Sequence, residues 1–80
     1  MENDAVKQLI EAGLPGSEVH VSGDGRHFEA QVICADFEGK TLIQQHRMVK
    51  ETVKTQLESD ELHALSIKTF TPEKWAEQNG

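Results

Sequence analysis

The side chains of this sequence with the widest chemistry are four histidines and a single cysteine: His20, His27, His46, His63 and Cys34. A neutral imidazole can move protons near neutral pH, and histidine is the commonest metal ligand among protein side chains. One cysteine excludes a disulfide within the chain, and it excludes a metal or cluster site built from this chain's cysteines alone. Any metal bound here must use histidines, carboxylates or ligands from a partner.

Judged by pattern alone, four of these five side chains favour structural roles, and His20 is expected to be a solvated strand residue without a role. His20 falls on the polar side of an alternating strand, and His46 is the polar member of an apolar helical stripe. His27 and His63 each stand where a strand begins, and their spacing matches no known ligand motif. Cys34 continues an apolar alternation, which predicts a small core residue and not a reactive thiol.

Signatures of catalysis are absent from the sequence. There is no Walker loop, no Cys-x-x-Cys, no His-Glu-x-x-His and no Gly-x-Ser-x-Gly. The serines and carboxylates stand without an obvious base and orienting group, and a sheet this small encloses little volume for a substrate. We therefore predict that the protein is not an enzyme and that its function is binding.

Hydrophobic periodicity predicts six elements in the order α-β-β-α-β-α. The predicted helices cover residues 3–13, about 41–58 and a short segment from Pro72, and the predicted strands cover 18–22, 27–37 and 62–70. The Gly-Asp-Gly-Arg turn at 23–26 makes the first two strands an antiparallel hairpin, whereas the intervening helix allows the last two to be parallel. We expect a two-layer α+β domain with a mixed three-stranded sheet.

Length and composition set limits on the class of protein. Eighty residues with 36% hydrophobic and 28% charged side chains predict one globular domain spanning 1–80. No segment approaches the roughly 20 apolar residues of a membrane span, and the start of the chain does not resemble a secretory signal, so a cytoplasmic protein is expected. The net charge of −6 repels polyanions at long range, which argues against general nucleic-acid binding.

Two stretches resemble one known family. "FEGKTLIQQHRMVKETV" and "LHALSIKTFTPEKW" resemble the BolA family, with matching positions at Phe37, Gly39, His46, Arg47, Val49, His63, Thr71, Pro72 and Trp75. The resemblance covers essentially the whole chain. "VHVSGDGRHFEAQV" is similar to the bacterial IbaG-like (YrbA-like) subgroup of that family. The resemblance implies a fold related to class II KH domains.

The resemblance also implies a role for His63. In BolA-like proteins the matching histidine ligates iron when the protein pairs with a monothiol (CGFS) glutaredoxin around a shared 2Fe-2S cluster. The glutaredoxin brings its cysteine and the thiolate of bound glutathione. A second ligand comes from the loop between the first two strands, where His27 is the nearest candidate. His27 can equally occupy the place of a structural histidine, and His63 would then be the only ligand from this chain.

Cations and one aromatic side chain are further candidates for contacts. Arg47 and Lys50 are candidates for binding glutathione carboxylates or an acidic patch of the partner, and Trp75 is a candidate interface anchor. The alternative function is that of a KH-like, nucleic-acid-binding transcription regulator using Arg26, Arg47, Lys50 and Lys54. The Gly-x-x-Gly clamp of KH domains is missing, so weak DNA binding is expected. A homodimer is a further candidate state of the free protein.

Overall fold

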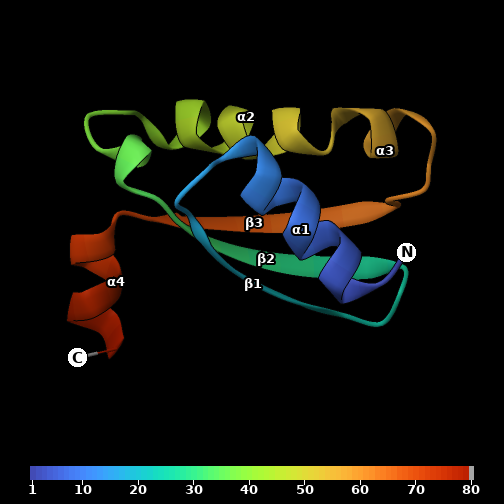
Figure 1. Cartoon of the computed structure of the whole chain (residues 1–80), viewed down its shortest axis with the longest axis horizontal. Coiled ribbons are helices and arrows are strands. Elements are labelled where there is room, and N and C mark those ends of the chain that lie inside the picture. Colours follow the sequence, from blue (N-terminus) through green and yellow to red (C-terminus); the bar gives the residue numbers. More distant parts are fainter. Residues whose placement is uncertain (80) are drawn as a thin grey trace.

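The computed structural model describes residues 1–79 and contains a three-stranded sheet with three of its α-helices on one side and the C-terminal helix set apart from them (Figure 1). In chain order the elements are α1 (Asn3–Gly13), β1 (Glu18–Gly23), β2 (His27–Ile33), the short 3-10 helix η1 (Ala35–Phe37), α2 (Leu42–Thr52), α3 (Lys54–Glu58), β3 (Ala64–Phe70) and α4 (Pro72–Asn79). The α+β class and the order of the strands agree with the predictions from sequence. The second strand, predicted to reach residue 37, ends at Ile33, because Ala35–Phe37 form η1.

The sheet has the order β1-β2-β3 and is mixed, as predicted. β1 and β2 form an antiparallel hairpin, because only the short turn after Gly23 joins them. β2 and β3 are parallel, and the crossover between them contains α2 and α3. The register of this parallel pair places His27 opposite Ala64, so both strands begin at the same end of the sheet.

The core lies between the sheet and the layer formed by α1, α2 and α3. Alternate residues of β2 point into it, and Phe28, Ala30 and Val32 are buried. Cys34 belongs to the same core and is 3% exposed, which confirms the prediction of a small core residue. Burial on this scale removes Cys34 from any ligand set that a partner protein could reach.

The predicted continuous helix over 41–58 is wrong at one point, because α2 and α3 meet at a break. Val53 leaves the helical region with φ −123° and ψ 20°, and its amide donates to the Lys50 carbonyl, one residue short of the α-helical partner. The apolar period continues through the break, and Val49 and Val53 are both buried. Periodicity alone therefore could not detect it. The same stripe predicted a packed Leu42, but Leu42 is 62% exposed.

Gln45 of α2 ties this helix to the rest of the crossover. Its amide nitrogen donates to the carbonyl oxygens of Phe37 and Lys40, and its side-chain oxygen accepts the Thr69 hydroxyl at 2.6 Å. Thr41 begins α2 with a capping box in which it exchanges hydrogen bonds with Gln44. These contacts fix α2 against β3. No helix among residues 1–79 is long and apolar enough to cross a membrane.

Candidate functional site

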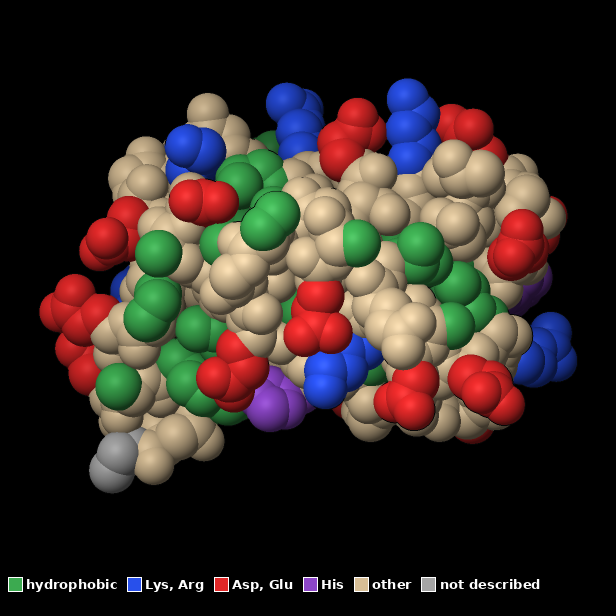
Figure 2. Space-filling view, in the orientation of Figure 1, with side chains coloured by type: hydrophobic (Ala, Val, Ile, Leu, Met, Phe, Trp, Pro, Cys, Tyr) green, Lys and Arg blue, Asp and Glu red, His purple; other side chains and the backbone are tan. Residues whose placement is uncertain are grey.

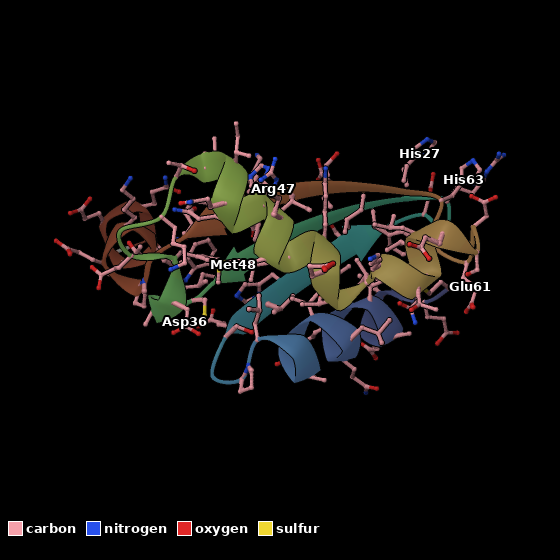
Figure 3. The ribbon with its side chains drawn as sticks, turned by 90° about the horizontal axis from the view of Figure 1, so that it is seen from above. His27, Asp36, Arg47, Met48, Glu61 and His63 are labelled. Atoms are coloured by element: carbon pink, nitrogen blue, oxygen red, sulfur yellow. The ribbon has the colours of Figure 1, made fainter. Side chains whose placement is uncertain are left out.

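The end of the sheet where β2 and β3 begin brings two of the four histidines together. His27 is the first residue of β2, and His63 immediately precedes β3. Because His27 pairs with Ala64 in the parallel register, His63 directly precedes the residue opposite His27, and both histidines lie at the same end of the sheet. Both side chains are exposed at this end of the molecule, beside Glu61 (Figure 3). Sequence reasoning proposed both histidines, and the fold brings them to the same end of the sheet.

Asp24 fixes the backbone at His27. Its carboxylate accepts the amides of His27 at 2.9 Å and Arg26 at 3.0 Å, and its own amide donates to the His27 carbonyl. Gly25 follows with φ +96°, a conformation that glycine adopts at little cost. At Gly23 a Cβ would collide with the His27 carbonyl oxygen, so glycine is needed for this close approach. The hairpin turn therefore holds the start of β2 in one conformation.

Leu62 fixes the chain at His63. It is fully buried, and its amide donates to the Gln56 carbonyl at 3.0 Å. Asp60 turns the chain just before it with φ 63°, a left-handed conformation that aspartate tolerates better than most residues. A buried anchor directly before an exposed histidine leaves the imidazole free while its backbone is held.

Two residues that support this end were not singled out from the sequence: Asp24 and Leu62. Asp24 carried a usable signal, because aspartate two or three residues before the end of a turn commonly accepts backbone amides. Leu62 is the first residue of the apolar run 62–70, and the prediction included it in the third strand. β3 instead starts at Ala64, two residues later.

The pKa of Asp24 makes the turn sensitive to acid. The amides of His27 and Arg26 hold the pKa of this carboxyl below its usual 3.8. Its stabilisation of the turn is complete above the unfolded value and is lost as the pH falls through the lower folded value. We expect the gap in melting temperature between wild type and Asp24→Asn to be constant near pH 5 to 6 and to shrink below about pH 3.8. Thermal unfolding followed by circular dichroism measures this gap, and a gap that is the same at pH 5 and 2.5 contradicts the assignment.

Arg47, Lys50 and Lys54 line a shallow hollow of about 430 Å³ on the outer face of α2 and α3. Two carboxylates, Glu51 and Glu58, share its lining. Figure 2 shows the same alternation of blue and red side chains along the top of the molecule, over these helices. The fourth predicted cation, Arg26, lies apart from them in the hairpin turn. The set proposed for nucleic acid is therefore divided between two places and interrupted by acids.

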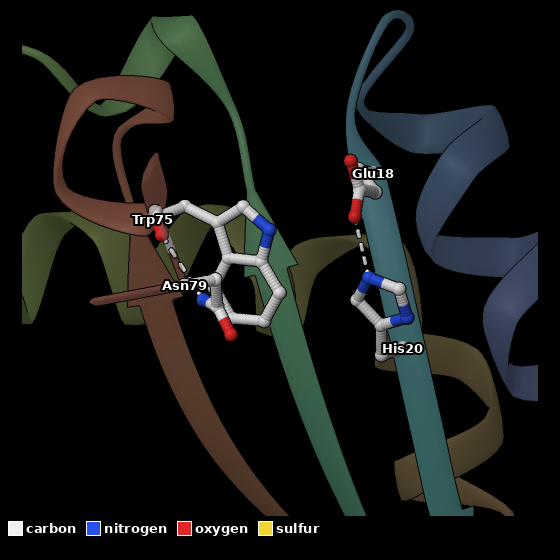
Figure 4. A network of polar contacts seen from close by, with 4 residues as sticks. All are labelled: Glu18, His20, Trp75 and Asn79. Atoms are coloured by element: carbon white, nitrogen blue, oxygen red, sulfur yellow. Dashed lines mark hydrogen bonds and ion pairs between the residues drawn. The ribbon is translucent and has the colours of Figure 1, made fainter. Parts of the chain in front are cut away.

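Trp75 lies at the opposite end of the sheet from His63, because α4 follows the last residue of β3 (Figure 1). Its ring stacks on His20 with centroids 5.4 Å apart and meets Phe70 edge-on at 5.1 Å. His20 also pairs with Glu18 (Figure 4). Between the strands that carry these partners lies Ile33, which is only 5% exposed.

Two predictions change as a result. His20 was assigned to a solvated strand face without a role, whereas its ring packs α4 against the sheet. Trp75 was a candidate anchor for the partner at His63, and the structure does not bring the two together. Trp75 instead covers apolar surface on the sheet face that α1 to α3 leave open.

Among residues 1–79, no three histidine, cysteine or acidic side chains lie close enough to hold a metal by themselves. His27 and His63 are a pair of potential ligands without a third from this chain. His46 is half-buried on α2, away from this end.

The family model for BolA-like proteins matches residues 6–74. The chain belongs to the BolA-like family. Acid stress protein IbaG of Escherichia coli strain K12 is 34% identical to it over 76 residues, covering 95% of this chain and 90% of IbaG. The solved structure of a BolA homologue from Coxiella burnetii is 44% identical with a TM-score of 0.87, covering 95% of this chain and 97% of that one.

A further BolA-like relative is the DNA-binding transcriptional regulator BolA of Haemophilus influenzae. It is 34% identical over 65 residues, covering 79% of this chain and 62% of that protein. These matches confirm the resemblance to BolA-like proteins, including the bacterial IbaG-like subgroup, and they confirm the fold.

Proposed function

We propose that this BolA-like protein pairs with a monothiol (CGFS) glutaredoxin and supplies histidine ligands to a 2Fe-2S cluster shared between the two proteins. The observation that carries the proposal is the placement of His27 and His63 at one exposed end of the sheet, on adjacent strand starts. The pair then acts in the trafficking of iron-sulfur clusters or in iron homeostasis. The chain serves as a ligand donor and adaptor and catalyses no reaction of its own.

The donor set of this chain fits half of such a site. Each iron of a 2Fe-2S cluster takes two protein ligands besides the bridging sulfides, and two histidines can occupy both places on one iron. His27 and His63 are exposed at this end of the sheet, whereas Cys34 is buried in the core. The remaining ligands come from the glutaredoxin cysteine and from glutathione. A shared cluster needs ligands at a surface, and both imidazoles meet that requirement.

The cluster supplies one-electron redox chemistry, at a potential that mixed histidine and cysteine ligation raises relative to cysteine ligation alone. This chain's part is to present neutral imidazoles in fixed positions. Asp24 holds the backbone of His27, and Leu62 holds the chain before His63. Because only neutral imidazole binds a metal, proton uptake by these histidines opposes cluster binding.

Arg47 and Lys50 support the same partnership from the outer face of α2. An arginine can grip a carboxylate with two hydrogen bonds, and glutathione carries two carboxylates. Because the chain as a whole carries a charge of −6, an anion such as glutathione is expected to bind where cations are paired locally.

The experiment for the proposal is native mass spectrometry of an equimolar mixture with a CGFS glutaredoxin that holds its cluster and glutathione. The expected species is a heterodimer with one 2Fe-2S cluster and one glutathione. If the cluster stays entirely in glutaredoxin homodimers, the proposal is wrong. A heterodimer without a cluster would show that the two proteins dock and that this chain donates no ligand.

The second ligand is tested by His27→Ala. We expect this variant to keep the heterodimer but to shift the cluster's visible absorption and circular dichroism, because one iron exchanges an imidazole for another ligand. Spectra of the wild-type and variant complexes, recorded at equal cluster content, check this expectation. Identical spectra would assign His27 a structural role and leave His63 as the only ligand from this chain.

The alternative function is nucleic-acid binding, which the name of the Haemophilus influenzae relative favours. Three observations argue against nucleic-acid binding. The candidate cations are split between two places, the carboxylates Glu51 and Glu58 lie among them, and the net charge of the chain is −6. We expect duplex DNA to bind weakly at physiological salt, and fluorescence anisotropy with a labelled duplex measures this. Tight binding that weakens with salt and with Arg47→Ala would favour the alternative.

A further inference from the structure

The outer edge of β3 is a row of unpaired backbone groups. β3 is the last strand of the sheet, and the Cys34 amide donates to the Phe70 carbonyl, so Phe70 points its backbone groups toward β2. Because these groups alternate along a strand, the amides of Leu65, Ile67 and Thr69 point the other way. No other element of residues 1–79 pairs with this edge. Such an edge is a template for an added strand.

A hollow with a partly apolar lining lies beside the same edge. It has a volume of about 400 Å³ and is lined by Leu42 and His46 of α2, Ile67 to Phe70 of β3, and Gln78 of α4. Leu42 and Ile43 are the two large hydrophobic side chains that the described residues leave most exposed, at 62% and 66%. Leu42 lines the hollow, whereas Ile43 does not. An apolar side chain of an added strand would cover Leu42 here.

The charge in the lining of this hollow is opposite in sign to that of the whole chain. Lys68 is the only charged residue in the lining of the hollow, which contains no aspartate or glutamate. Arg47 projects from α2 toward the side on which β3 lies (Figure 3). The molecule as a whole carries −6. This local inversion favours a segment that carries carboxylates.

The edge is also continuous with the histidine pair. β3 begins one residue after His63, and its first outward amide is that of Leu65. A strand that lies along β3 therefore runs directly up to the end of the sheet where His27 and His63 are exposed.

We propose that the glutaredoxin partner lays an extended, acidic segment along the outer edge of β3. Its backbone pairs with Leu65, Ile67 and Thr69, an apolar side chain enters the hollow beside Leu42, and a carboxylate lies near Lys68. This inference rests on the proposed function and adds to it the docking surface that brings the cluster to the histidines.

Amide hydrogen exchange measured by NMR tests the strand addition. The full-length protein is compared alone and saturated with cluster-bearing CGFS glutaredoxin. Exchange at Leu65, Ile67 and Thr69 is expected to slow about tenfold or more, whereas Ser66 and Lys68, which already face β2, change little. The alternation distinguishes a paired strand from general covering of the surface.

Two matched pairs of variants test the side-chain contacts. Leu42→Ser is expected to weaken the complex about tenfold, a loss of about 1.4 kcal/mol, whereas Ile43→Ser outside the hollow has less than about a twofold effect. Lys68→Glu is expected to weaken the complex, most strongly at low salt, whereas the same charge change at Lys7 on α1 does not.

The outcomes separate this inference from the proposed function. A cluster complex that depends on His63 but leaves the three amides unprotected overturns the strand addition and keeps the proposed function. Absence of any complex overturns both. Protection that grows with protein concentration before the partner is added assigns the edge to a second copy of this chain, and it overturns the proposal.

Discussion

The His63→Ala variant is expected to lose the heterodimeric 2Fe-2S complex while it keeps the stability of the wild type. Methyl cannot replace an imidazole as a ligand, and among residues 1–79 no group of three histidine, cysteine or acidic side chains could hold the iron instead. His63 is exposed and outside the strand, so its removal leaves the core intact. Surface substitutions of this kind change the free energy of unfolding by about 0.5 kcal/mol or less.

Visible circular dichroism of the mixture with cluster-bearing glutaredoxin measures the loss, and urea unfolding measures the stability. His20→Ala is the matched control, since His20 is an exposed histidine at the far end of the sheet. The control should give the wild-type cluster spectrum. A wild-type spectrum from His63→Ala would remove His63 from the ligand set.

Leu62→Ala is expected to be among the most destabilising single substitutions near the site. Leu62 is fully buried in the core directly before His63. Truncating a buried leucine to alanine costs about 2 to 5 kcal/mol, through lost burial and the cavity that remains. For a small domain whose total stability is about 5 to 15 kcal/mol, this is a large fraction. Urea unfolding of the free protein gives the change directly.

The Leu62 variant also separates anchoring from ligation. Under conditions where it remains folded, we expect a weaker cluster complex with an unchanged cluster spectrum, because the ligand is present but less firmly held. Leu57→Ala, at a half-buried position of α3, is the control for loss of stability without loss of the anchor. A cost below about 1 kcal/mol for Leu62→Ala would contradict the role of Leu62 as a core anchor.

The arrangement of the strands could be predicted because connection length determines it. The turn at 23–26 is too short for anything but a hairpin, and the crossover from Ala35 to His63 is long enough to return a parallel strand. Because the second and third strands are parallel, residues that start them lie at the same end of the sheet, and this places His27 and His63 at one end. The part of the site that carries the proposal was therefore accessible from sequence.

Other features depend on contacts that local patterns do not encode. The break at Val53 preserves the apolar period, so no change of pattern marks it. The position of α4 depends on the path of the chain at Thr71, which decides whether Trp75 lies over the open sheet face or turns away. The stacking of Trp75 on His20 is a contact between residues 55 positions apart, and neither residue's neighbours predict it.

The most direct test of the account is pulsed electron paramagnetic resonance of the reduced heterodimer, prepared with ¹⁵N-histidine in this chain only. Coordinated imidazole nitrogen couples to the unpaired electron of the reduced cluster, whereas distant histidines do not. The account predicts ¹⁵N couplings from this chain that disappear in His63→Ala and decrease in number in His27→Ala. A reduced cluster in the heterodimer with no ¹⁵N coupling from this chain would contradict the central claim.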